Sequence, residues 1–179
     1  MKRSFDIILS MIPPILKQNS IILLHHEAWM VKSHLHRGQS SDTYLVHNDL
    51  HLPFIVKAYH PETPAMARDV ESYETLKALG VMMPLLLHVE PSQRMLVKQY
   101  LNGDTVAQML KKQRLNPLLL SKMKDLADYL KNKGVMLDYH PENFMVLDTL
   151  IYYVDYTCLP YAASHDFDHV GLALWQDNV

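Results

Sequence analysis

The sequence contains little cysteine and no long apolar run. Its 179 residues include one cysteine, Cys158, and a single thiol cannot form an internal disulfide. Such a chain suits a reducing compartment, so we expect a cytoplasmic protein; a secreted effector is the alternative that its small size permits. No segment reaches the roughly 18–20 consecutive apolar residues that a membrane-spanning helix needs. The sequence therefore predicts no membrane span.

An excess of positive charge is also lacking. The 17 Lys and Arg residues are outnumbered by 19 Asp and Glu residues, which gives a net charge of −2. Proteins that bind nucleic acid usually carry a basic excess, so we expect no nucleic-acid partner. The chain starts with an apolar run, but Asp6 and Pro13 interrupt it and no small-residue cleavage site follows. We therefore predict no signal peptide.

Apolar residues are plentiful enough for a sizeable core. They make up 49% of the chain, against 20% charged residues, a balance that argues against disorder. Runs rich in Val, Ile, Tyr and Phe at residues 28–36, 42–48 and 53–60 predict strands of an antiparallel meander. Helices are predicted at residues 4–18, 63–79, 105–113, 116–134 and 165–176, and further strands at residues 95–101, 143–148 and 151–156. This order favours an α+β fold.

A cluster of polar residues interrupts the apolar segment GVMLDYHPENFMV, residues 134–146. Asp138 and Asn143 have the D-x-x-x-x-N spacing of a protein-kinase catalytic loop. With His140 between them, the segment resembles the D-x-H-P-x-N form of the atypical (RIO-type) and aminoglycoside-type kinases. Asp155, twelve residues after Asn143 in YYVDYT, then takes the place of the metal-binding Asp of D-F-G.

Other segments resemble the remaining parts of a kinase. FIVKAY is similar to the strand that carries the nucleotide-binding lysine, here Lys57. LVKQYLNGDT is similar to the segment that links the lobes, and implies that Gln99 and Leu101 offer backbone groups to adenine. Ile55 and Met145 would enclose the adenine ring. The resemblance implies an N-terminal lobe of about residues 1–100.

The C-terminal part resembles a reduced helical lobe. DFDHVGLALW keeps the spacing of a family helix in which Asp166, five residues before Gly171, braces the catalytic loop. The resemblance covers about residues 28–176. It implies a single minimal domain with a bilobal fold, in which an antiparallel sheet with one helix is joined near residues 99–104 to a mostly helical lobe of about residues 104–179.

The resemblance also implies roles and cofactors. Lys57 would bind the phosphates of ATP, while Asn143 and Asp155 would supply the oxygen ligands that Mg²⁺ prefers. Asp138 would orient the acceptor hydroxyl and take its proton. His140 would lie beside the γ-phosphate. This division of labour suits phosphoryl transfer, which needs charges neutralised and groups aligned.

The acid that pairs with Lys57 is open among three residues of the predicted helix. Asp69 projects towards the apolar face of that helix, as the 3.6-residue period requires. Glu71 points nearly opposite and Glu74 lies at the border. We choose Asp69 as the partner and keep Glu71 and Glu74 as alternatives.

Several features depart from the kinase pattern. The segment expected to cover the phosphates contains Gly38 alone, so Ser40, Ser41 and backbone N–H groups would have to cradle them. The arginine of H-R-D is absent before Asp138. His165 follows Asp155 by only ten residues, which leaves no room for a long activation segment, and the usual helical docking region is missing.

These features lead to alternative functions. Retention of Asp138, Asn143 and Asp155 favours an active ATP- and Mg²⁺-dependent kinase that phosphorylates a hydroxyl, with Ser or Thr of a protein as the expected acceptor. A small-molecule kinase of the aminoglycoside type is the enzymatic alternative. The single glycine of the phosphate segment favours a pseudokinase that binds a partner protein, with or without a bound nucleotide.

Overall fold

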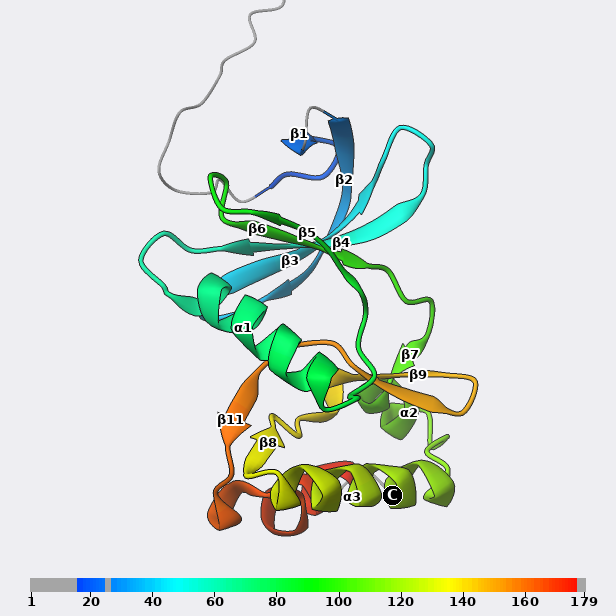
Figure 1. The fold of residues 1–179 in the computed structure, drawn as a ribbon. Helices are drawn as coiled ribbons and strands as arrows, with labels where there is room; N and C mark the ends of the chain where they lie inside the picture. The colour runs from blue at the N-terminus through cyan, green and yellow to red at the C-terminus, as the bar shows by residue number, and fades with distance from the viewer. Residues whose placement is uncertain (1–15, 25–26, 177–179) are drawn as a thin grey trace, which may run out of the picture. The chain divides into compact units, whose positions relative to one another are not determined.

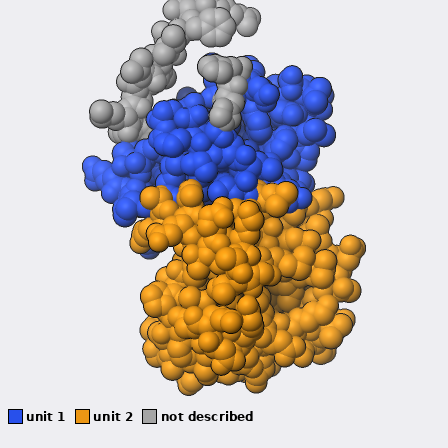
Figure 2. Space-filling view, viewed as in Figure 1, with its two compact units in different colours: residues 1–66, 86–100 blue, residues 67–85, 101–179 orange. Residues whose placement is uncertain are grey.

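The computed structural model describes residues 16–24 and 27–176 (Figure 1). Most of the helix predicted for residues 4–18 lies outside these ranges. The chain divides into two compact units, residues 1–66 with 86–100 and residues 67–85 with 101–179 (Figure 2). The boundary after residue 100 falls within the segment predicted as a hinge, and the hinge itself stays a prediction. The α+β class is confirmed.

The first unit is built on a 6-stranded sheet with the order β1-β2-β3-β4-β6-β5, in which all neighbours are antiparallel. Its strands are β1 (Ile21–Leu24), β2 (Glu27–Arg37), β3 (Ser41–His47), β4 (Pro53–Tyr59), β5 (Leu86–Glu90) and β6 (Met95–Gln99). The predicted strands at residues 28–36, 42–48, 53–60 and 95–101 are confirmed, whereas β1 and β5 were not predicted.

Alternation along these strands separates the two faces of the sheet. One face buries Val31, Tyr44, Val56 and Val97 in an apolar core, as period-2 patterning requires. Lys57 lies on the other face, paired across the ladder with Thr43 on β3 and Leu96 on β6.

The second unit combines helices with two small sheets. Its helices are α1 (Ala65–Ala78, of which the first two residues belong to the first unit), α2 (Val106–Lys111), α3 (Pro117–Asn132) and α4 (Leu172–Gln176). Strands β7 (Asp104–Thr105), β9 (Phe144–Leu147) and β10 (Leu150–Tyr153) form one sheet, and β8 (Val135–Leu137) pairs with β11 (Cys158–Pro160) in the other. The hairpin predicted at residues 143–156 is confirmed.

Helix α3 shows how local sequence sets the elements of this unit. Asn116 caps its first turn by accepting a hydrogen bond from the Leu118 N–H, and proline occupies the first helical position. Leu119, Met123, Ala127 and Leu130 form its buried stripe. The helix ends before Gly134, whose φ of 75° suits glycine, and β8 starts at once.

Two observations differ from the sequence predictions. The N-terminal lobe was predicted as residues 1–100, but most of α1 groups with the second unit, because Leu76 enters that unit's core. The segment predicted as one helix at residues 165–176 begins with a π-helical turn, Phe167–Gly171, before α4. A Cβ on Gly171 would lie 2.3 Å from Cδ2 of Phe167, so the turn packs this tightly only with glycine there.

Candidate active site

The loop of residues 138–143 connects β8 to β9 in the second unit. Leu137 and Tyr139 are buried on either side of Asp138, which is exposed. The following Pro141–Asn143 segment forms a 3₁₀ turn with proline at its first position, where a missing N–H costs nothing. The buried neighbours therefore anchor the loop while the carboxylate of Asp138 faces solvent.

Hydrogen bonds within the loop link the predicted catalytic and metal-binding residues. The side-chain amide of Asn143 donates to the carbonyl oxygen of Asp138 over 3.3 Å. The backbone N–H of Asn143 donates to the His140 carbonyl, and the His140 N–H donates to Oδ1 of Asp138. Because its amide nitrogen is used here, Asn143 has its amide oxygen to offer to a cation.

The segment that carries Asp155 runs beside this loop. The Val154 N–H donates to the Asn143 carbonyl over 2.8 Å, so the residue before Asp155 is hydrogen bonded to Asn143. The Thr157 hydroxyl donates to Oδ2 of Asp155 over 2.5 Å. Tertiary structure thus brings Asp138, Asn143 and Asp155 onto adjoining backbone segments, and their catalytic and metal-binding roles stay predictions.

Tyr156 has a backbone conformation that is rare for a bulky residue. Its φ is 71°, in the left-handed region, which costs of the order of 1–2 kcal/mol for an L-residue. Its hydroxyl donates to the Pro84 carbonyl over 2.5 Å, and its ring packs 4.9 Å from that of Tyr73. These contacts hold the strained residue in place directly after Asp155.

A buried tryptophan braces the loop, and sequence reasoning missed it. The indole N–H of Trp175 on α4 donates to the Tyr139 carbonyl over 2.9 Å. The role of brace was predicted for Asp166. Its hydrogen bonds go instead to the Tyr161 hydroxyl and to the backbone and ring of His169, so Asp166 caps the turn that leads into α4. Nothing in the motif spacing singles out Trp175.

The environment of Asp166 lowers its pKa. Burial of the carboxyl raises the pKa, but hydrogen bonds from His169 and Tyr161 outweigh that effect and hold the pKa at about 2. The carboxylate is therefore ionised throughout the neutral range, and it attracts Lys131, whose Nζ lies 3.8 Å from Oδ2.

Lys57 and the candidate acids differ in their surroundings. Lys57 on β4 is only 9% exposed, with its Nζ 5.5 Å from the centroid of the Tyr59 ring. Among the three acids on α1, Asp69 is buried whereas Glu71 and Glu74 are exposed. Burial agrees with the face predicted for Asp69, and its pairing with Lys57 stays a prediction.

The other predicted nucleotide contacts are spread over both units. Ile55 on β4 is half-buried and Gln99 at the end of β6 is exposed, both in the first unit. In the second unit, Leu101 is buried, Met145 on β9 is half-buried and His140 is exposed. Their contacts with adenine or phosphate stay predictions.

The predicted phosphate segment forms the turn between β2 and β3. The Gly38 N–H donates to the Ser41 carbonyl over 2.9 Å, and the His60 N–H donates to the Ser40 carbonyl over 2.9 Å. Ser41 is buried and Ser40 half-buried. The turn is therefore short and fastened to the residue that follows β4.

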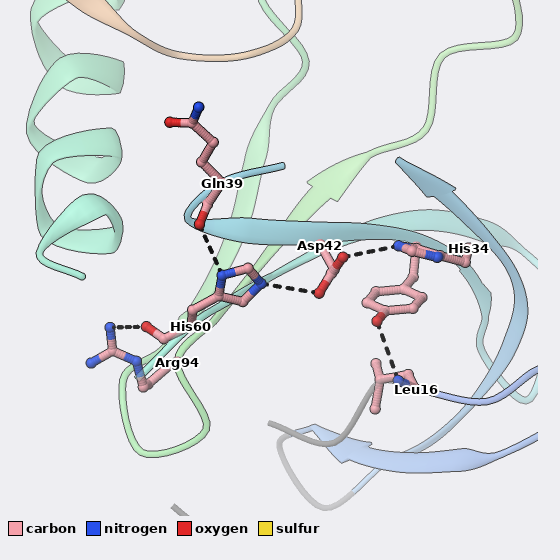
Figure 3. A network of polar contacts seen from close by, with 7 residues as sticks. Leu16, His34, Gln39, Asp42, His60 and Arg94 are labelled. Carbon is pink, nitrogen blue, oxygen red and sulfur yellow. Dashed lines mark hydrogen bonds and ion pairs between the residues drawn. The ribbon is translucent and has the colours of Figure 1, made fainter. Parts of the chain in front are cut away.

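A histidine–carboxylate network surrounds this turn (Figure 3). Asp42 lies between His34 and His60, whose Nε2 atoms are each 3.1 Å from one of its oxygens. Nδ1 of His60 lies 3.0 Å from the Gln39 carbonyl, and the Arg94 guanidinium donates to the His60 carbonyl. Both ring nitrogens of His60 thus lie within hydrogen-bonding distance of an oxygen atom.

Magnesium binding by Asn143 and Asp155 fits the chemistry of these side chains. Within residues 16–24 and 27–176, no group of three or more His, Cys, Asp or Glu side chains is arranged to hold a metal ion. Mg²⁺ bound with a nucleotide commonly takes one or two carboxylates together with phosphates and waters. A pair of protein oxygen ligands therefore suffices for that kind of site.

Comparison with known proteins adds no family assignment. No model of a known protein family matches the chain, and no curated protein is significantly similar to it. Among the helices of the described residues, none is both long enough and apolar enough to cross a membrane.

Proposed function

We propose that the protein is an ATP- and Mg²⁺-dependent phosphotransferase that acts on a hydroxyl group, with Ser or Thr of a protein as acceptor. One observation carries the proposal. Asp138, Asn143 and Asp155 lie on adjoining segments of the second unit, joined by the hydrogen bond from Val154 to Asn143. We further propose that the two units correspond to the lobes of a reduced kinase-like fold.

The proposed reaction assigns one task to each residue. Asp138 accepts the proton of the acceptor hydroxyl. At the same time the hydroxyl oxygen bonds to the γ-phosphorus, and the bond from that phosphorus to the leaving ADP oxygen breaks. Asn143 and Asp155 would hold Mg²⁺, which would supply positive charge to neutralise the phosphates. Lys57, on the sheet of the first unit, is assigned to the same phosphates by its place in FIVKAY.

Transfer from labelled ATP tests the proposal. Wild type and the variants Asp138→Asn and Asp155→Asn are compared with Mg²⁺, using autophosphorylation, protein mixtures and small hydroxyl compounds as acceptors. We expect each variant to lose about 10²-fold or more in rate. Asp148→Asn is the matched control, because Asp148 is exposed in the turn between β9 and β10. Equal rates in all four proteins would contradict the proposal.

A pseudokinase that binds a partner protein is the second candidate function, and the turn between β2 and β3 favours it. That turn contains a single glycine, Gly38, and its Gln39 and Ser40 carbonyls face His60. Thermal unfolding with and without Mg²⁺–ATP distinguishes the candidates. A nucleotide at a hundred times its Kd adds about 2.7 kcal/mol to the free energy of unfolding, whereas a protein that binds only a partner shows no change.

A further inference from the structure

Tyr153, the last residue of β10, contacts both segments of the candidate site. Its side chain is 1% exposed, and its ring packs 5.1 Å from that of Phe144. The hydroxyl donates to the Thr157 carbonyl over 2.9 Å. The same oxygen accepts the Asp138 N–H over 3.4 Å, a longer and weaker contact. One buried oxygen atom thus lies between the backbone of Asp138 and the backbone of Thr157, two residues after Asp155.

The hydroxyl uses both of its hydrogen-bonding capacities in this position. A tyrosine hydroxyl has one donor and also accepts, and here each partner is a backbone group. The link therefore holds the main chain on both sides. Thr157 extends it, because the Thr157 hydroxyl donates to Oδ2 of Asp155. The chain of contacts runs from the backbone of Asp138 through Tyr153 and Thr157 to the Asp155 carboxylate.

We propose that Tyr153 is a positioning residue that sets the placement of Asp155 relative to Asp138 through its buried hydroxyl. This inference rests on the proposed phosphotransferase function, since the spacing of these two carboxylates matters only if both meet one substrate complex. Nothing in the motif spacing identified Tyr153, which reads in the sequence as an ordinary buried strand residue.

Packing alone does not account for the hydroxyl. Phenylalanine would fill nearly the same space beside Phe144 without placing a polar atom in the core, where an unpaired polar group is costly.

The variant Tyr153→Phe tests the structural half of the inference. It removes one oxygen and leaves the ring. We expect the backbone amide signal of Asp138 to shift in NMR spectra and its hydrogen exchange to speed up, because its N–H loses its acceptor. The carbonyl carbon signal of Thr157 should also shift, because that carbonyl loses its donor. Tyr44→Phe is the matched control. Tyr44 is also 1% exposed, and its hydroxyl accepts a backbone N–H, that of Leu16, over 3.2 Å in the first unit.

Kinetics test the functional half. Both variants should lower Tm by a similar amount, about 2–6 °C for a domain of this size. In Tyr153→Phe we expect kcat to fall about 10-fold or more while KM for ATP stays within about 3-fold, since misplaced groups slow the chemical step. In Tyr44→Phe both constants should stay at the wild-type values.

The outcomes separate the inference from the proposed function. Wild-type kcat in folded Tyr153→Phe, or an equal loss in Tyr44→Phe, would overturn the positioning role and leave the phosphotransferase proposal standing. A wild-type protein that transfers no phosphate to any acceptor would overturn both. Shifts of the Asp138 amide and the Thr157 carbonyl would then show that the hydroxyl links the two segments for structural reasons alone.

Discussion

The loop of residues 138–143 in the second unit and the turn of residues 38–41 in the first are held by different kinds of side chain. Tyr153 and Trp175 fasten the loop with a hydroxyl and an indole N–H, both buried among aromatic rings. The turn is instead fastened by His60, whose ring lies between the Gln39 carbonyl and the carboxylate of Asp42. Aromatic side chains of the core thus hold the loop, whereas an imidazole ring and a carboxylate hold the turn.

This difference indicates which kind of interaction holds each segment in place. The hydrogen bonds of the loop depend on packing, because the aromatic rings of Tyr153, which accepts, and Trp175, which donates, are part of the core. The hydrogen bonds of the turn depend on where the ring nitrogens of His60 lie relative to Asp42 and the Gln39 carbonyl. Substitutions that remove packing should therefore affect the second unit most, and substitutions that change a ring nitrogen should affect the first.

The largest effect is expected when packing behind the loop is removed. Trp175 is fully buried and contacts the rings of Phe144 and Phe167. Trp175→Ala should lower the free energy of unfolding by about 3–5 kcal/mol. Trp175→Phe keeps a ring but leaves the Tyr139 carbonyl without its donor, which should cost about 1–3 kcal/mol. Urea unfolding followed by circular dichroism measures both, and equal losses in the two variants would show that the hydrogen bond contributes everything.

A smaller, pH-dependent effect is expected at Asp166, a buried carboxylate of the second unit. Its folded pKa of about 2 lies below the ordinary 3.8, so the folded state favours the ionised form. The resulting stabilisation is fully present above about pH 4 and is lost as pH falls towards 2, by up to about 2 kcal/mol. Unfolding free energies of wild type and Asp166→Asn at pH 7, 4 and 2.5 measure this.

The two proteins should differ most at pH 7 and converge at pH 2.5. A difference that is the same at all three pH values would mean that Asp166 stabilises the second unit as a hydrogen-bonding group, without a contribution from its charge.

The smallest effect is expected in the turn of the first unit. His60→Gln keeps a donor near Asp42 but loses the contact with the Gln39 carbonyl, whereas His60→Asn places its amide nearer that carbonyl. Losing one such hydrogen bond costs about 0.5–1.5 kcal/mol. We therefore expect the Gly38 amide, bonded to Ser41, to exchange about 3–10 times faster in His60→Gln than in His60→Asn.

His34→Gln is the control for the turn, because the hydrogen bond of His34 reaches Asp42 and not the Gln39 carbonyl. The Gly38 amide should exchange there at the wild-type rate. Faster exchange in His34→Gln would mean that the position of Asp42, rather than the contact of His60 with the Gln39 carbonyl, holds the turn.

Local sequence by itself determined the strands β2, β3, β4 and β6, the helix α3 and the spacing of Asp138 and Asn143. Each depends on neighbours close in the chain. Alternation needs residues two apart, the start of α3 needs Asn116 and the proline after it, and the motif spans 138–143. Such short-range patterns are visible before folding.

Only the tertiary structure decided what holds those motif residues in place. The hydrogen bonds from Asp138 to the Tyr153 hydroxyl and from Trp175 to the Tyr139 carbonyl join residues 15 and 36 positions apart, and no periodicity relates positions at such distances. The network of His34, Asp42 and His60, the pairing of β8 with β11 and the grouping of α1 with the second unit have the same origin. They follow from which buried surfaces pack together, and that depends on the whole chain.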